Sequence, residues 1–250
     1  MSTAHLLGTL AVTLFFCLAF LRGRHLPLLG KMGHRTVVSV AGGAAVAYVF
    51  MDLLPELGEA ALGFREATSH LGTRLLDYGI HAATMAGFLF FYGLEELVIR
   101  SRDEEERRRR REAGRAHPLF RIHMIAFATY AWIVSYLMVG SAQQTARSLA
   151  FYAVAMALHF LSVAHALHEE HGARYDRIGA PLLVAFSATG WACGLAVELP
   201  EPVCGVLLGV VAGGIIANTT ISELPREKEG RFVPFLVGAV AYTGLLFLAR

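Results

Sequence analysis

Eight long apolar stretches, separated by short polar segments, constrain the fold of this chain more than any other feature. Each is close to the roughly 20 residues that a helix needs to cross a bilayer. Because lipid offers the backbone no hydrogen-bond partners, such stretches must be helical. We therefore predict an all-α integral membrane protein, with residues 1–250 forming a single transmembrane domain of about eight helices. The predicted spans are 4–21, 36–55, 79–99, 120–140, 146–168, 178–197, 203–223 and 232–249.

The composition agrees with this class and argues against others. Hydrophobic residues make up 55% of the chain, and the formal net charge is only +2. Soluble domains carry more polar residues, and nucleic-acid-binding domains are more basic. The lipid bilayer is thus an expected partner, and nucleic acid is not. Cys17, Cys193 and Cys204 lie in or beside apolar stretches without metal-ligand spacing, so we interpret them as buried apolar residues.

The distribution of Lys and Arg predicts the topology. Of the 22 basic residues, 18 lie in four segments, 21–35, 100–121, 169–178 and 226–231, which follow alternate spans. Positive residues favour the cytoplasmic side, so both termini should lie on the outer side of the membrane. We expect this membrane to be a bacterial inner (plasma) membrane. Residues 100–119 form a charged cytoplasmic loop, whose acidic block before a basic block favours a solvated extension of the third helix.

The second and seventh predicted helices resemble each other. The second begins its small-residue stretch with Ala41-Gly-Gly and places Asp52 before Leu-Leu-Pro. The seventh has Ala212-Gly-Gly and places Glu223 before Leu-Pro. The two helices should cross the membrane in opposite directions, and similar segments in opposite orientation are typical of inverted-repeat transporters. Small residues are common wherever membrane helices touch, so a chance match is the alternative.

These motifs resemble the ZIP family of divalent-metal transporters. The second helix ends in Met51-Asp-Leu-Leu-Pro-Glu56, the third contains Phe88-Leu-Phe-Phe-Tyr-Gly-Leu-Glu-Glu-Leu97, and the seventh ends in Ile221-Ser-Glu-Leu-Pro225. Eight spans, outer termini and a long charged loop after the third helix also match, so the resemblance covers nearly the whole chain. It implies a ZIP-like bundle with an inverted repeat, in which the fourth and fifth helices hold the metal. The transported ion would be Zn²⁺ or Fe²⁺.

The chain departs from the family at the metal site itself. ZIP proteins carry a His-Asn pair and then a carboxylate in the fourth helix, where this chain has Tyr130 and Ala131 at the pair and Val134 at the carboxylate. In the fifth helix His159 matches a family ligand, but Phe160 and Val163 stand where carboxylates are expected. The resemblance therefore implies a degenerate metal site.

Ionisable residues within the spans are the candidate metal ligands. An intramembrane charge costs roughly 3 kcal/mol on insertion scales, so such residues usually face the bundle interior. Zinc prefers histidine nitrogen and carboxylate oxygen. In the fifth helix, His165, His168 and Glu169 are spaced by three and four residues, so they share one face of the helix. An ion leaving toward the cytoplasm would meet this face. The candidate metal residues are His159, Asp52, Met51, His165, His168, Glu169 and Glu223.

Other ionisable residues have both structural and functional interpretations. Glu56, His123 and Glu198 could add ligands from helix ends, whereas we interpret Glu95 and Glu96 as interfacial or packing residues. Histidines at the end of the fifth helix also suit the negative end of a helix dipole without any metal.

Three functions remain open at this point. The first is a ZIP-like divalent metal cation transporter, and the second is a non-transporting ZIP-like protein acting as a regulatory or partner subunit. The third is a haem-binding membrane protein, because His123 and His165 should lie at similar depth and two histidines can hold a haem iron. No Walker A, Rossmann or nucleophile-elbow motif occurs, so we do not expect an enzyme. A homodimer is a further expected assembly.

Overall fold

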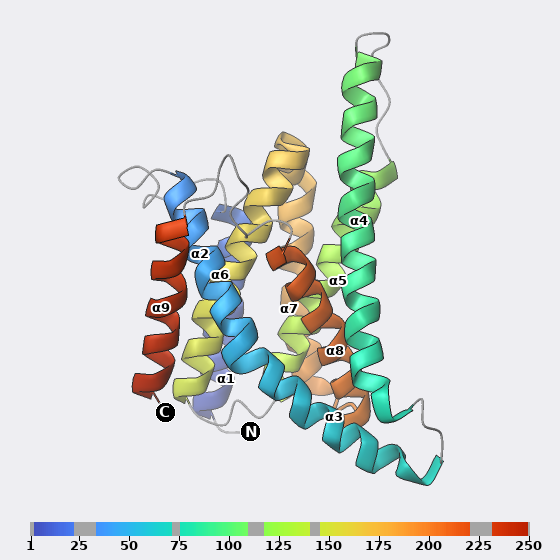
Figure 1. Cartoon of the computed structure of the whole chain (residues 1–250), viewed down its shortest axis with the longest axis vertical. Helices are drawn as coiled ribbons and strands as arrows, with labels where there is room; N and C mark the ends of the chain where they lie inside the picture. Colours follow the sequence, from blue (N-terminus) through green and yellow to red (C-terminus); the bar gives the residue numbers. More distant parts are fainter. Residues whose placement is uncertain are drawn as a thin grey trace.

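The computed structural model describes residues 3–22, 34–71, 76–109, 118–140, 146–220 and 232–249. All regular structure in these residues is helical, which confirms the all-α prediction (Figure 1). The α-helices are α1 (Thr3–Arg22), α2 (His34–Tyr48), α3 (Leu54–Thr68), α4 (Gly79–Arg109), α5 (Pro118–Gly140), α6 (Ala146–His171), α7 (Ala180–Ala196), α8 (Glu201–Asn218) and α9 (Phe232–Ala249). Two π-helical turns, η2 (Val49–Leu53) and η5 (Tyr175–Gly179), precede α3 and α7, and two 3₁₀ turns, η3 (Ser69–Leu71) and η4 (Leu76–Tyr78), follow α3.

The helices form a membrane-embedded bundle. Six stretches are long and apolar enough to cross a bilayer: Thr3–Arg22, Ser39–Thr68, Leu119–Gly140, Leu149–His171, Tyr175–Ala196 and Glu201–Asn218. The apolar part of α9, Phe232–Leu248, is slightly shorter. The count among the described residues is thus six or seven, slightly below the predicted eight. Large apolar side chains on the outside of the bundle, such as Leu14, Phe90 and Leu248, are exposed as lipid-facing residues would be.

The sequence predicted that the second span ends at its Leu-Pro motif, but the helix continues beyond it. The helical path runs from α2 through the π-turn η2 directly into α3, and Pro55 occupies the first turn of α3. Because proline has no backbone N–H, the continuous helix loses one hydrogen bond at Pro55, which favours a bend at this point. As Figure 1 shows, α3 leans away from the bundle axis and crosses beneath α8 and α4.

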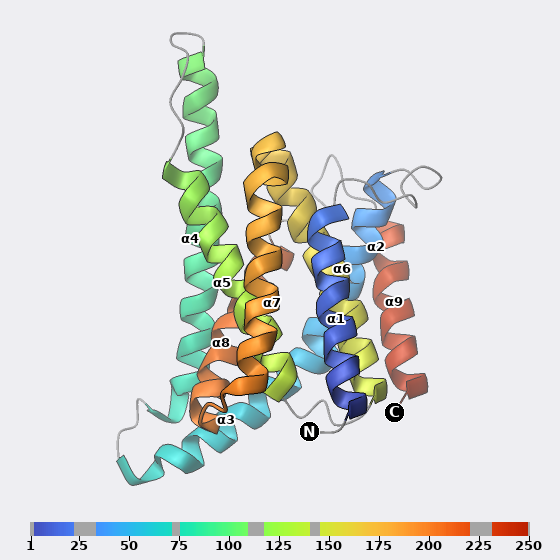
Figure 2. The same ribbon diagram turned by 180° about the vertical axis from the view of Figure 1, so that it is seen from behind.

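The charged segment after the third span begins as a helix. α4 continues without interruption to Arg109, and its last part projects beyond the rest of the bundle (Figures 1 and 2). This extension is the one predicted from the acidic and basic blocks. The remainder of the predicted charged loop, residues 110–117, lies outside the described residues.

Consecutive spans alternate in direction. α1, α4, α6 and α8 run one way, and α2, α5, α7 and α9 run the other (Figures 1 and 2). The start of α1 and the end of α9 therefore lie at the same end of the bundle, which we call the terminal end. The other end, where α1 finishes and α5 begins, is called the opposite end.

The packing of the helices is pseudosymmetric. The most extensive contacts join α4 with α8, α5 with α7, and α2 with α9, followed by α1 with α6. Exchanging α1 with α7, α2 with α8, α4 with α9 and α5 with α6 converts each of these pairs into another pair on the same list. The contact of α2 with α6 likewise becomes that of α8 with α5. Exchanged helices run in opposite directions, as an inverted repeat requires.

Glycine contacts fix the register of this repeat. A side chain at Gly43 of α2 would overlap the backbone of Phe235 in α9, and one at Gly213 of α8 would overlap the backbone of Thr84 in α4. Gly43 and Gly213 are 170 positions apart, whereas Thr84 and Phe235 are 151 apart.

The reverse contacts follow the same register. Gly238 of α9 meets the carbonyl oxygen of Val40, and Gly87 of α4 meets that of Val210, again at separations of 151 and 170 residues. The π-turn that begins at Val49 recurs at Thr219, also 170 positions later. The inverted repeat is therefore a property of the backbone packing, and its register differs by one residue from the Ala-Gly-Gly alignment of the sequence.

Candidate metal centre

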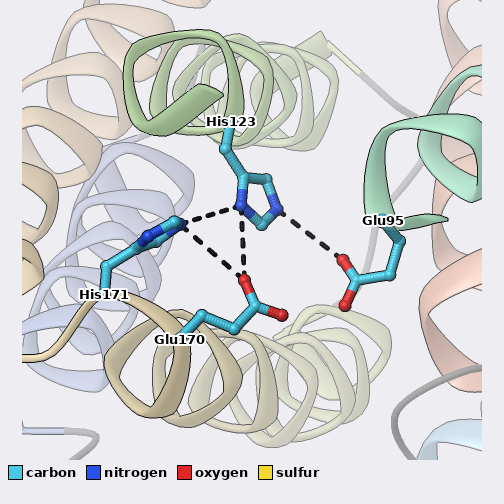
Figure 3. Close-up of polar contacts among 4 residues, drawn as sticks. All are labelled: Glu95, His123, Glu170 and His171. Carbon is cyan, nitrogen blue, oxygen red and sulfur yellow. Dashed lines mark hydrogen bonds and ion pairs between the residues drawn. The ribbon is translucent and has the colours of Figure 1, made fainter. Parts of the chain in front are cut away.

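Three helices bring histidines and carboxylates together at the opposite end of the bundle. His123 lies in the second turn of α5, Glu170 and His171 form the end of α6, and Glu95 lies on α4 (Figure 3). The backbones of α5 and α6 do not pack closely, and their side chains bridge the space between them. The chain reaches this arrangement because α5 begins where α6 ends, at the same end of the bundle (Figure 2).

One nitrogen of His123 faces two side chains of α6. Its Nδ1 lies 2.9 Å from Nε2 of His171 and 3.3 Å from Oε2 of Glu170. Nε2 of His171 lies 3.7 Å from the same Glu170 oxygen. The two rings share one hydrogen bond, so one nitrogen donates and the other accepts. These are the only three His, Cys, Asp or Glu residues of the described chain whose ligand atoms gather within 4.8 Å.

The spacing of these three atoms suits a metal ion. In a tetrahedral zinc site with bonds of about 2.0–2.1 Å, neighbouring ligand atoms lie about 3.3 Å apart. The three distances within the group, 2.9, 3.3 and 3.7 Å, are distributed around that value. An ion could therefore be held by small movements of side chains alone. Two imidazoles and one carboxylate would leave at least one coordination position open.

The second nitrogen of His123 faces the opposite way. Its Nε2 lies 3.7 Å from Oε2 of Glu95 on α4 (Figure 3), and within the described residues it has no hydrogen bond. The His123 side chain is only 1% exposed, against 15% for that of Glu95. A metal-bound histidine almost always donates its other N–H to a carboxylate, carbonyl or water. Glu95 is placed to take that role when Nδ1 of His123 binds an ion.

Aromatic side chains separate the group from the rest of the bundle. The ring of Phe120 packs edge-on against His171, and Phe127 packs at a tilt against His123. The guanidinium of Arg174 lies 4.3 Å above the Phe120 ring. These contacts restrain both histidine rings, so their orientations are largely set before a ligand arrives.

The residues predicted from sequence lie in several different places. His159 is buried at the bundle centre, where its Nε2 lies 2.9 Å from the hydroxyl of Tyr130. His168 is paired with Asp176 of η5 at 3.0 Å, and Glu169 is exposed. His165 is half-buried, and no metal-ligand group of the described chain includes it.

The predicted ligands of the second and seventh helices are also apart from this group. Asp52 accepts a hydrogen bond of 3.4 Å from the Tyr242 hydroxyl of α9, in the half of the bundle near the terminal end. Met51 packs against the apolar core, and Glu223 lies outside the described residues. A metal role for these residues therefore stays a prediction, because the structure gathers none of them with the three ligand atoms at His123.

The sequence did contain a signal for the observed group, although the residues that helical spacing predicted are neighbours of the ones that the structure brings together. His171 and Glu170 belong to the same run of histidines and glutamates as His165, His168 and Glu169. Spacing alone shows which residues share a helix face, but it does not show which face meets α5. His123 was considered a helix-end ligand and a haem ligand paired with His165, whereas the structure pairs it with His171.

No protein-family model, curated protein or solved structure matches this chain.

Proposed function

We propose that this membrane protein binds a divalent cation of the zinc or iron class through His123, Glu170 and His171, and that it moves the ion across the membrane. The observation that supports binding best is the group of three ligand atoms around Nδ1 of His123. Two histidines and one carboxylate suit zinc in catalytic or exchangeable sites, and the same set holds non-haem Fe²⁺. Mg²⁺ and Ca²⁺ prefer sites built from oxygen, so they are poor candidates.

Three features support transport of the ion. An open coordination position lets an ion enter and leave, whereas structural zinc sites are closed by four ligands. The group lies at one end of a bundle of membrane-spanning length, beside the Phe120 ring that Arg174 covers. The inverted repeat is the architecture of many secondary transporters. The resemblance of the Leu-Pro and Gly-rich motifs to the ZIP family points the same way.

A pair of adjacent glutamates provides a sharp test of the binding site. Zinc affinity of the purified chain should fall at least about tenfold in Glu170→Gln, since a carboxylate ligand is lost. Glu169→Gln is the matched control, because Glu169 is exposed and lies one residue away. We expect its affinity to equal that of the native chain. Equal affinity in both variants, or a loss confined to Glu169→Gln, would remove Glu170 from the site.

The side chains at the bundle centre favour a second function, in which the protein senses a metal without transporting it. At the position where ZIP proteins hold their metal, Tyr130 is hydrogen-bonded to His159, and Phe160 and Val163 are fully buried beside them. Such a centre offers an ion few ligands, which favours a protein that senses metal through the His123 group without transporting it. This is the regulatory or partner-subunit hypothesis in a more specific form.

Uptake into proteoliposomes separates the two functions. The transporter hypothesis predicts uptake of zinc or Fe²⁺ by the native chain and slower uptake by His171→Ala. Zinc binding to native protein without any uptake would favour the sensing function. His168→Ala serves as the control, because His168 lies one turn away from His171 and is paired with Asp176.

A further inference from the structure

Three arginines lie at the opposite end of the bundle, where α5 and the π-turn η5 begin. Arg121 is in the first turn of α5, Arg174 immediately precedes η5, and Arg177 lies within it. Arg121 and Arg177 are exposed, and Arg174 is half-buried. Each lies at most two residues from the start of an apolar span, Leu119–Gly140 or Tyr175–Ala196. The three guanidinium groups therefore belong at the depth of the lipid headgroups, where arginine is stable at the end of a membrane helix.

Two contacts hold the beginning of α5 against η5. The guanidinium of Arg174 lies 4.3 Å above the ring of Phe120. One turn further along α5, the sulfur of Met124 lies so close to Gly179 that an added Cβ there would approach it to 2.6 Å. α5 and α7 then pack along each other, and α7 lies between α5 and α1 (Figure 2). The three arginines therefore extend from one small part of the bundle surface.

No carboxylate of the described residues compensates these charges. None of the ion pairs within the described ranges includes any of the three arginines. The nearby carboxylate of Asp176 is 3.0 Å from a nitrogen of His168, and that of Glu170 belongs to the His123 group. Like charges on neighbouring turns repel one another, so an anion bound between them would be stabilising. Arginine suits a phosphate in particular, because its planar group can donate two parallel hydrogen bonds to it.

Exposed apolar side chains next to the arginines indicate the source of this phosphate. Ile122 and Ile125 of α5 and Ile178 of η5 are each more than half exposed. Both helices run from this end toward the membrane interior, so the isoleucines lie at or below the depth of the arginines. Arg121 and Ile125 are four residues apart and share a helix face. A free phosphate would leave this apolar surface uncovered, whereas the acyl chains of a lipid would cover it.

We propose that this surface binds an anionic phospholipid. The guanidinium groups of Arg121, Arg174 and Arg177 hold the headgroup phosphate, and the acyl chains lie on the three isoleucines. Basic residues between membrane helices are suited to anionic headgroups in this way. A zwitterionic lipid binds more weakly, because its own positive group is repelled by the uncompensated arginines.

The lipid site is distinct from the proposed metal centre. None of the three arginines belongs to the group of His123, Glu170 and His171. The two sites are connected only by Phe120, whose ring contacts both Arg174 and His171. Lipid binding can therefore be measured on the metal-free chain, and its outcome does not depend on the proposed zinc or iron site.

The test is the melting temperature of the purified chain in a non-ionic detergent that contains a chelator. Phosphatidylglycerol is added in one series and phosphatidylcholine with the same acyl chains in another. A ligand that binds only the folded state raises the melting temperature in a saturable way. We expect a rise of about 3 °C or more with phosphatidylglycerol, and a rise less than half as large with phosphatidylcholine.

Variants of exposed arginines show where the lipid binds. The double variant Arg121→Gln, Arg177→Gln changes two exposed side chains, so it should fold, and its response to phosphatidylglycerol should fall by at least half. Arg65→Gln is the control, because Arg65 is exposed on α3 at the other end of the bundle, and it should respond like the native chain.

Three results would overturn the proposal. The first is an equal rise with both lipids, and the second is a native-like response in the double variant. The third comes from a series with inorganic phosphate alone. If phosphate produced the full rise at the same concentration, the ligand would be a free anion and not a lipid.

Discussion

His123 lies between two carboxylates, and each of its ring nitrogens faces a different one. Nδ1 faces Glu170 and His171, and Nε2 faces Glu95 on another helix. A buried imidazole held in this way is oriented before metal arrives, and the far carboxylate raises its basicity once the ion is bound. We therefore propose that Glu95 positions His123 for metal binding without touching the ion itself.

Replacing Glu95 tests this role. Zinc affinity should fall about 10- to 100-fold in Glu95→Gln, because the amide stabilises the metal-bound imidazole less than a carboxylate does. Glu96→Gln is the control, since the Glu96 side chain is 43% exposed and forms an i,i+4 ion pair with Arg100. Competition with a fluorescent zinc chelator measures both affinities. Glu95→Asp should recover part of the loss, whereas unchanged affinity in Glu95→Gln would show that Glu95 does not act on His123.

The contacts of individual side chains were harder to predict from the sequence than the positions of the helices. His159 was predicted as the central ligand because its position matches the ZIP pattern, but its ring is hydrogen-bonded to Tyr130 among aromatic side chains. Glu95 was interpreted as a packing residue, because nothing in the sequence places it beside a histidine 28 positions away. Which face of a helix meets which neighbour is decided by tertiary packing, and periodicity does not reveal it.

Whole helices were more predictable, because apolar length and glycine position act locally. The small residues of α2 and α8 indicated close helix contacts, and the structure places backbone of α9 and α4 against them. The kink between α2 and α3 was missed, because Leu-Pro was taken as a helix end. The π-turn and Pro55 instead redirect one continuous helix.

The glycine contacts lead to a prediction for stability. Gly43→Ala and Gly213→Ala should each destabilise the protein by about 1–3 kcal/mol, because the added methyl group overlaps the backbone of the partner helix. Gly93→Ala on α4 meets nothing within 4 Å, so it should be neutral or slightly stabilising. Thermal unfolding followed by tryptophan fluorescence provides the comparison. Equal melting temperatures in all three variants would contradict the packing of α2 on α9 and of α8 on α4.

The arginines of the described residues gather mainly at one end of the bundle, as the alternating directions of the helices predict. Arg22, Arg121 and Arg174 lie at or beside the helix ends that meet at the opposite end of the bundle, and Arg100 lies on α4 before its projecting part. The sequence could predict this arrangement because alternating spans and basic segments are read directly from its pattern. The orientation in the membrane, with the terminal end outside, stays a prediction.

Labelling of single cysteines tests that orientation. In a chain without its three native cysteines, a cysteine at Arg65 should react with a membrane-impermeant reagent in intact cells. A cysteine at Arg107, on the α4 extension, should react only after the cells are opened, because its end of the bundle is predicted to be cytoplasmic. Labelling of both positions from outside would contradict the alternating arrangement, and exchanged accessibility would reverse the orientation.

Zinc X-ray absorption spectroscopy of the zinc-loaded chain shows whether His123, Glu170 and His171 together bind a divalent ion. We expect nitrogen and oxygen ligands at about 2.0–2.1 Å from the zinc, with the scattering signature of two imidazoles. The signature should fall to one imidazole in His171→Ala and stay at two in His168→Ala. A shell without imidazole, or one that is the same in native chain and His171→Ala, would contradict the account.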